Sequence, residues 1–124
     1  HWGYEYKLKA DFNTQVKPGR AWIDAGADMV IGHHPHVVQN FEVYNGKFIF
    51  YSLGNFIFDQ YWSTETQKQL GIGIVFDDAD EDGNLKTKVS LFPMKSDTSK
   101  PRLMTEDERK AWLGFSACWQ QSRI

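Results

Sequence analysis

The chain has 124 residues, a formal net charge of −2 at pH 7, and 41% hydrophobic and 15% aromatic residues, which is typical of one folded globular domain. No basic run exceeds two residues, which argues against nucleic acid as a partner, and no apolar run approaches the roughly 20 residues of a membrane span. These residues also carry no signal-peptide pattern, and the single cysteine, Cys118, excludes an internal disulfide.

The first third of the chain predicts a helix followed by a buried strand. The chain begins at His1 within HWGYEY, without a start methionine, and we expect it to be a piece of a longer protein. Apolar positions at helical spacing predict a helix over 15–25, with Pro18 in its first turn and Gly26 just past its end. The apolar run at 27–31 predicts a buried strand that opens onto a loop.

The middle of the chain predicts two β-hairpins. An Asn-Gly pair lies within 37–53, and this pair favours a two-residue hairpin turn because both positions need positive φ. A second hairpin is predicted from 71–77 and 85–93. The acidic turn between these strands begins like an EF-hand calcium loop, but its twelfth position is Val89 rather than glutamate. We therefore interpret it as a solvated turn.

The last part of the chain predicts a polar linker over 96–104 and a helix over about 106–121. Thr105 and Glu108 have the spacing of a capping box, in which each side chain bonds the other residue's backbone N–H. The apolar side chains at helical spacing, which predict a packed stripe, are Trp112, Phe115 and Trp119.

Three of the four histidines lie on the loop after the predicted buried strand, in GHHPH. An imidazole binds zinc, iron or manganese through one ring nitrogen while a hydrogen bond fixes the other. His34 and His36 have His-x-His spacing, and Pro35 reduces the entropy lost when both are ordered. His33 remains open as a ligand, a partner of a ligand or a contact to a substrate oxyanion. Surface histidines are the alternative, but their place at a strand end favours a metal or phosphate-type site.

Two further segments carry candidate site residues. His1 would be the fourth histidine of the site, and Glu5 is the nearest carboxylate in the sequence. In SLGNF, the Gly-Asn pair can turn the backbone sharply and present the Asn55 amide to a site. A plain turn is the alternative interpretation of that segment.

Together, HWGYEY, AWIDAGADMVIGHHPHVVQ and YSLGNFIFD resemble the CapA family of poly-γ-glutamate capsule synthesis proteins over about residues 1–77. That family is similar in turn to calcineurin-like metallophosphoesterases, which are α/β sandwiches with two metals at the carboxyl ends of their strands. The resemblance implies an α/β fold, the C-terminal half of such a sandwich, with β-hairpins and a C-terminal helix. The predicted site has His1, His34 and His36 as ligands of divalent Mn, Zn or Fe, Glu5 and His33 as catalytic proton donors, and Asn55 as a substrate contact.

The chain departs from the family pattern in three places. The doubled histidine leaves the counterpart of the phosphoesterase Gly-His-x-His turn ambiguous by one residue, and we take His34 and His36. DFNTQ lacks a proline that the family usually shows before the glutamine. The family's upstream Gly-Asp and Asn-Asn-His segments, which hold and bridge a metal pair, are absent. With at most three ligands, all histidine, we expect weak or absent metal binding and no catalysis by these residues alone.

The predicted organisation is a CapA-like part over 1–95, a linker over 96–104 and a helical segment over 105–124. The resemblance implies an extracytoplasmic place in the bacterial cell envelope, poly-γ-glutamate or a small phosphoester as substrate, and as partners the N-terminal half of the domain and other capsule-synthesis proteins. One alternative is a non-catalytic scaffold or polymer-binding subunit. Another is a domain that pairs a sheet edge with a second copy.

Overall fold

The computed structural model describes residues 1–79 and 85–115, which form two three-stranded sheets and helices at both ends of the described chain. The elements are a π-helical turn Phe12–Val16, α1 Lys17–Asp24, β1 Val30–Ile31, β2 Phe41–Tyr44, β3 Lys47–Phe50, β4 Lys68–Ala79, β5 Leu85–Asp97, β6 Lys100–Leu103 and α2 Glu106–Phe115.

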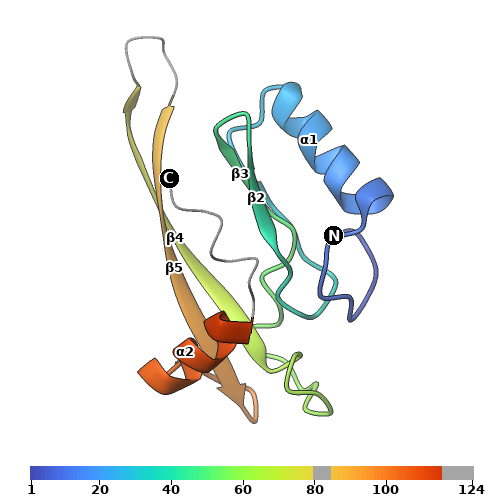
Figure 1. The fold of residues 1–124 in the computed structure, drawn as a ribbon, viewed down its shortest axis with the longest axis vertical. Coiled ribbons are helices and arrows are strands. Elements are labelled where there is room, and N and C mark those ends of the chain that lie inside the picture. The colour runs from blue at the N-terminus through green and yellow to red at the C-terminus, as the bar shows by residue number, and fades with distance from the viewer. Residues whose placement is uncertain (80–84, 116–124) are drawn as a thin grey trace.

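Strands β1 to β3 form the first sheet, and Figure 1 shows it between α1 and the long β4–β5 hairpin. This mixed α/β architecture confirms the coarse fold class, and the full metallophosphoesterase sandwich stays a prediction.

The helix and strand predicted in the first third are present, but the helical segment begins earlier than expected and the strand is shorter. The π-helical turn precedes α1, because the carboxylate of Asp11 accepts hydrogen bonds from the backbone N–H groups of Asn13 and Thr14 and starts the turn early. The predicted strand over 27–31 is reduced to the two residues of β1. Local apolar patterning therefore located both elements but not their ends.

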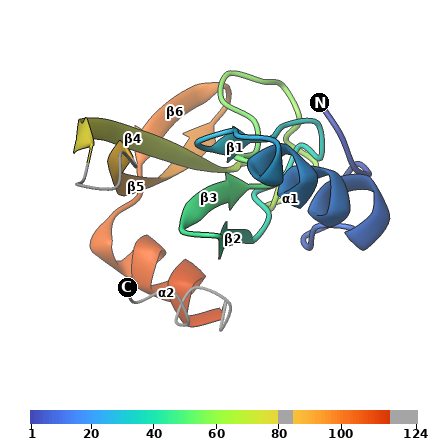
Figure 2. The same ribbon diagram turned by 90° about the horizontal axis from the view of Figure 1, so that it is seen from above.

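The first sheet has the order β1-β3-β2, with β1 parallel and β2 antiparallel to β3. The predicted hairpin is confirmed, since Asn45 and Gly46 adopt φ values of 50° and 75° between β2 and β3. The buried core of this sheet and α1 consists of Ile23, Val30, Ile49 and Tyr51. Figure 2 shows α1 lying along this sheet, where its buried face covers the core.

Replacing Gly46 with alanine is expected to lower the free energy of unfolding by about 1 kcal/mol, because its φ of 75° is unfavourable for an L-residue. A Cβ added there meets nothing within 4 Å, so the cost comes from the backbone alone. Urea unfolding of Gly46→Ala beside Gly46→Asn checks this, since asparagine tolerates positive φ. A larger loss for asparagine than for alanine would contradict it.

The second sheet has the order β4-β5-β6, and the predicted hairpin of β4 and β5 is confirmed with longer strands. The polar segment expected to be a linker instead holds the end of β5 and all of β6. Thr98 and Ser99, with φ values of 50° and 60°, form the turn between them. Backbone hydrogen bonds to the neighbouring strand hold such a polar strand in the sheet, and its side-chain pattern does not indicate them.

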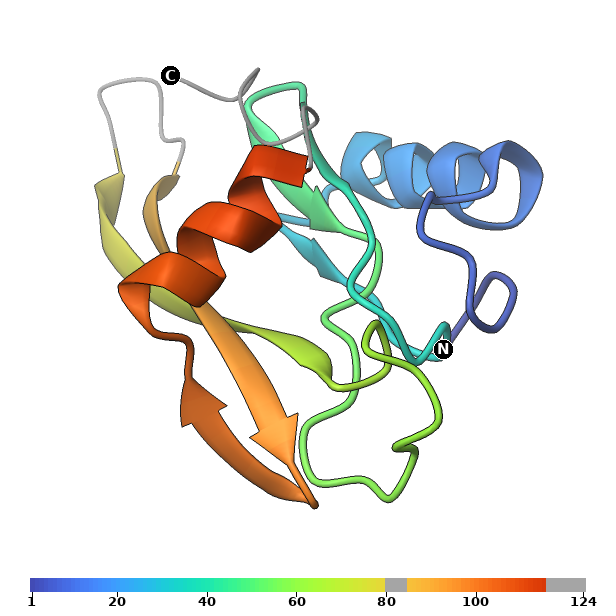
Figure 3. The same cartoon turned by 60° about the horizontal axis from the view of Figure 1, so that its bottom comes forward.

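The predicted C-terminal helix is confirmed over the ten residues of α2, which Figure 3 shows beside the second sheet. The capping box is present: Thr105 N donates to the Glu108 carboxylate at 2.9 Å, and Glu108 N donates to the Thr105 hydroxyl at 3.3 Å. Arg102 of β6 also bonds Glu108, which ties the helix start to the sheet and lowers the pKa of that carboxyl to about 2. The predicted helix beyond 115 and the stripe residue Trp119 lie outside the described residues.

No helix in the described ranges combines the length and apolar character needed to cross a membrane.

Candidate metal centre

The candidate site lies at the carboxyl ends of β1 and β3. These two strands are parallel neighbours, so the segments that follow them emerge at the same edge of the sheet. The histidine loop, residues 32–36, follows β1, and residues 51–55 follow β3. The fold therefore brings together two motifs that are well separated in the sequence.

The N-terminal segment lies against the histidine loop. Trp2 N donates to His33 O at 3.2 Å, and Tyr6 N donates to Pro35 O at 2.8 Å. The Trp2 indole Nε1 donates to Tyr51 O at 2.8 Å and packs against the core of the first sheet. These contacts hold the intervening residues, including Glu5, beside the histidines.

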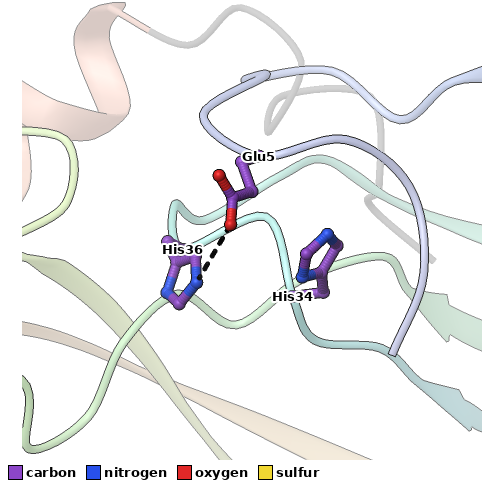
Figure 4. Close-up of side chains that lie close together, drawn as sticks. All are labelled: Glu5, His34 and His36. Atoms are coloured by element: carbon purple, nitrogen blue, oxygen red, sulfur yellow. Dashed lines mark ion pairs between the residues drawn. The ribbon is translucent and has the colours of Figure 1, made fainter.

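Glu5, His34 and His36 form the candidate metal-binding group among the described residues. One ligand atom from each lies within 4.8 Å of the others, and Figure 4 shows the Glu5 carboxylate beside the two imidazole rings. The His36 Nε2 to Glu5 Oε1 distance is 3.9 Å. Both histidines are half-buried and Glu5 is exposed. The structure thus adds a carboxylate to a set that the sequence predicted to be all histidine.

The other two histidines lie next to this group. The ring of His1 is 3.9 Å from the ring of His34, centroid to centroid, so the imidazoles converge as predicted, although His1 is outside the metal-binding group. His33 is exposed on the same loop. Partial desolvation of its ring nevertheless lowers the pKa of the His33 imidazole below its usual value, which favours the neutral form.

Backbone strain is concentrated at this site. His34, His36 and Tyr6 adopt φ values of 105°, 60° and 61°, a region that L-residues seldom occupy. Each such conformation costs roughly 1–3 kcal/mol and persists only where surrounding contacts enforce it. Strain at the two histidines of the metal-binding group supports a functional reason for their orientation.

Asn55 lies against His36, with its Oδ1 atom 2.7 Å from His36 Nδ1. The ring of His36 also contacts Tyr6, at a centroid distance of 5.9 Å, and Phe58, at 5.2 Å. Sequence analysis missed Tyr6 and Gln60, which contact each other through the Tyr6 hydroxyl and the Gln60 amide. Tyr6 is the last residue of the HWGYEY motif and Gln60 directly follows the YSLGNFIFD motif, but neither residue type by itself indicates a site.

The acidic segment that we interpret as a solvated turn rather than a calcium loop falls mostly on residues 80–84, outside the described ranges.

The first half of the chain matches a known protein family, and the chain is similar to several known proteins. The family model described as "Bacterial capsule synthesis protein PGA_cap" matches residues 1–60. The chain is 57% identical over 63 residues to the "PGA biosynthesis protein CapA" of Bacillus subtilis strain 168, an alignment that covers 51% of this chain and 16% of that protein. The "Capsule biosynthesis protein CapA" of Bacillus anthracis is 56% identical over 63 residues, with 51% and 15% covered.

A third relative, the "Uncharacterized protein y4sH" of Sinorhizobium fredii, is 50% identical over 50 residues, which are 40% of this chain and 10% of that protein. The chain therefore spans less than a fifth of the length of the curated relatives that it matches. The residues matched by the family model include the histidine loop. Residues 1–60 of this chain therefore match the family of bacterial capsule synthesis proteins, and the chain is similar to CapA proteins of that family.

Proposed function

We propose that this chain contributes a divalent-metal site to a protein of poly-γ-glutamate capsule synthesis, and that the intact protein is a metal-dependent hydrolase of the metallophosphoesterase type. The single observation that carries the proposal is the convergence of Glu5, His34 and His36 within 4.8 Å at a strand-end loop. The family match of residues 1–60 supports the place in capsule synthesis.

The donor set fits a first-row divalent metal. Imidazole nitrogens and a carboxylate oxygen are ligands of zinc, manganese and iron, at about 2.0–2.2 Å for zinc. Two ligands of one ion therefore lie roughly 3–4 Å apart, and the 3.9 Å between His36 Nε2 and Glu5 Oε1 falls in this range. The ligand atoms of all three residues lie within 4.8 Å of one another, so binding one ion would need only small rotations of their side chains.

A bound divalent ion supplies a water of lowered pKa as nucleophile and stabilises negative charge on a phosphoryl or carbonyl oxygen. The chain's own contribution is to hold that ion with Glu5, His34 and His36 and to keep the ligand loop rigid through the backbone bonds of Trp2 and Tyr6. His33 lies outside the ligand group on the same loop, and we assign it a role in proton transfer.

The proposal places the intact protein in the cell envelope, where a capsule is assembled, with poly-γ-glutamate or a small phosphoester as substrate. Other capsule-synthesis proteins are its proposed partners. The remaining ligands of a two-metal site would come from parts of the intact protein that this chain does not include.

A second candidate function is a non-catalytic polymer-binding subunit. The observation that favours it is a group of exposed apolar side chains that follow Asn55 in the sequence, with exposed fractions of 43–67%. These side chains are Phe56, Ile57, Phe58, Tyr61 and Trp62.

Two measurements on the intact protein and its His36→Ala variant separate the two functions. Loss of turnover of phosphodiester or γ-glutamyl substrates in the variant, with the fold retained, supports the hydrolase. Unchanged capsule output in the variant supports the polymer-binding subunit.

Calorimetric titration of the 124-residue chain with Mn²⁺ or Zn²⁺ is expected to show one weakly bound ion. Removing a ligand in Glu5→Gln, His34→Ala or His36→Ala should raise its dissociation constant by more than about 10-fold, since loss of an outer hydrogen bond to a ligand already costs 10–100-fold. His33→Ala, on the same loop but outside the group, is the matched control and should bind like the wild type. Equal affinity in all five proteins, or no binding by the wild type, would contradict the proposed site.

A further inference from the structure

We propose that Asn55 is a positioning residue that holds His36 in the tautomer with Nε2 unprotonated and directed to the metal site. Only the consequence for metal binding rests on the proposed function. The tautomer itself follows from the hydrogen bonds of the metal-free chain. The contact that carries the inference is the 2.7 Å distance between His36 Nδ1 and Asn55 Oδ1.

The neighbours of Asn55 determine which way its amide points. Its Nδ2 lies 3.2 Å from the backbone carbonyl of Thr66 and 3.1 Å from Gln60 Oε1. A carbonyl oxygen only accepts, so the NH₂ group must face Thr66. The Oδ1 atom must then face His36, and since Oδ1 also only accepts, His36 Nδ1 must carry the proton.

A neutral imidazole with a proton on Nδ1 has its lone pair on Nε2. In this structure Nε2 is the His36 atom that lies 3.9 Å from Glu5 Oε1. The tautomer selected by Asn55 therefore leaves a metal-binding nitrogen beside the Glu5 carboxylate. The opposite tautomer would present an N–H group there, which cannot bind a metal.

The same network holds the orientation of the ring and of Glu5. Gln60 accepts from Asn55 through Oε1 and donates from Nε2 to the Tyr6 hydroxyl at 3.1 Å. The Tyr6 ring stacks on His36 at 26°, which closes a circuit of four side chains that includes the imidazole itself. Tyr6 is also anchored to the histidine loop through Pro35 O, so the circuit positions its neighbour Glu5 as well.

This arrangement assigns Asn55 a role different from the substrate contact that the sequence predicted. Both of its amide hydrogens and its oxygen are engaged by groups of the chain itself. Asn55 therefore acts on a ligand of the metal rather than on the substrate. Its loss should change the state of His36 before any metal or substrate is present.

Long-range ¹H–¹⁵N NMR of the metal-free chain, at a pH where the imidazoles are neutral, reads the tautomer directly. We expect His36 to be the Nδ1–H form in the wild type. Asn55→Leu, which has a similar volume but no acceptor, should shift His36 toward the Nε2–H form. Asn55→Asp keeps an acceptor and should retain the Nδ1–H form. Gln67→Ala removes two hydrogen bonds from the same loop without touching His36 and should leave its tautomer unchanged.

Titration with Mn²⁺ then tests the consequence. Asn55→Leu should raise the dissociation constant about 10–100-fold, and Asn55→Asp should raise it less. A wild-type His36 in the Nε2–H form, or one that Asn55→Leu leaves unchanged, would overturn the inference. If Asn55→Leu fails to fold, the wild-type tautomer and Asn55→Asp still decide it. The predicted tautomer shift with no metal binding by any variant would instead leave Asn55 as assigned and remove the proposed metal site.

Discussion

Replacing Gly32 with alanine is expected to lower the free energy of unfolding by about 3 kcal/mol and to displace the histidine loop. A Cβ at this buried position would lie 2.2 Å from Trp2 Nε1 and 2.4 Å from the backbone oxygen of Tyr51. These two atoms are hydrogen-bonded to each other, so the added methyl group would separate them. Because one of the two atoms is backbone, the cost cannot be avoided by moving a flexible side chain.

Urea unfolding of Gly32→Ala beside Ile31→Ala checks this prediction. Ile31 is the preceding residue of β1 and is 43% exposed, so its truncation should cost much less. Metal titration of the folded fraction of Gly32→Ala should also show weaker binding, since the loop that holds His34 and His36 starts at this glycine. A loss of stability no larger than that of Ile31→Ala would contradict the packing argument.

Replacing Glu42 with glutamine is expected to lower the free energy of unfolding by about 1.5–2 kcal/mol at neutral pH. Its carboxylate accepts two hydrogen bonds from Arg20, at 2.7 and 3.0 Å, and one from the hydroxyl of the buried Tyr51. Glutamine would remove the negative charge. Its amide N–H group would also face the donors of Arg20 and Tyr51, and two donors cannot form a hydrogen bond with each other. The Arg20 side chain is 42% exposed, so solvent screening keeps the effect at the lower end for a charged pair.

The effect of Glu42 should depend on pH in a defined direction. The Arg20 guanidinium lowers the pKa of the Glu42 carboxyl below its ordinary value of 4.5. A carboxyl with a lowered pKa in the folded state stabilises the protein above that ordinary value, and this stabilisation is lost as pH falls through the folded pKa. The difference in stability between wild type and Glu42→Gln should therefore shrink below about pH 4.5.

Unfolding curves of both proteins, recorded from pH 7 to acid pH, measure this difference in the free energy of unfolding. The contributions of the other carboxylates are common to both proteins and cancel in the difference. Glu65→Gln is the control, because Glu65 forms a surface ion pair with Lys68 that is worth less than about 1 kcal/mol. A stability gap between wild type and Glu42→Gln that grows toward acid pH would contradict the assigned role of Arg20.

Features that depend on neighbouring residues were predictable from the sequence. The Asn-Gly turn between β2 and β3 forms because both residues tolerate positive φ, whatever lies around them. The capping box at the start of α2 forms because Thr105 and Glu108 reach each other's backbone within one helical turn. The histidine loop was identified for the same reason, since its ligand spacing is a local pattern.

Features that depend on distant residues were not predictable. The strand β6 lies in a polar segment whose side chains resemble a linker, and only its pairing with β5 makes it a strand. Glu5 was predicted to be a proton donor. The structure instead places it among the metal-binding residues, because the backbone hydrogen bonds of Trp2 and Tyr6 hold its segment against the histidine loop. No local pattern of carboxylates and histidines encodes that contact.

By itself, the sequence determined the resemblance of its first half to capsule synthesis proteins, the turn between β2 and β3, the helix cap and the choice of His34 and His36 as candidate ligands. Only the tertiary structure decided that a carboxylate completes the group and that Asn55 sets the protonated nitrogen of His36. The physical reason is that a ligand type and a turn conformation are properties of a few adjacent residues. A ligand distance or a tautomer is instead set by atoms that packing brings together from separate segments of the chain.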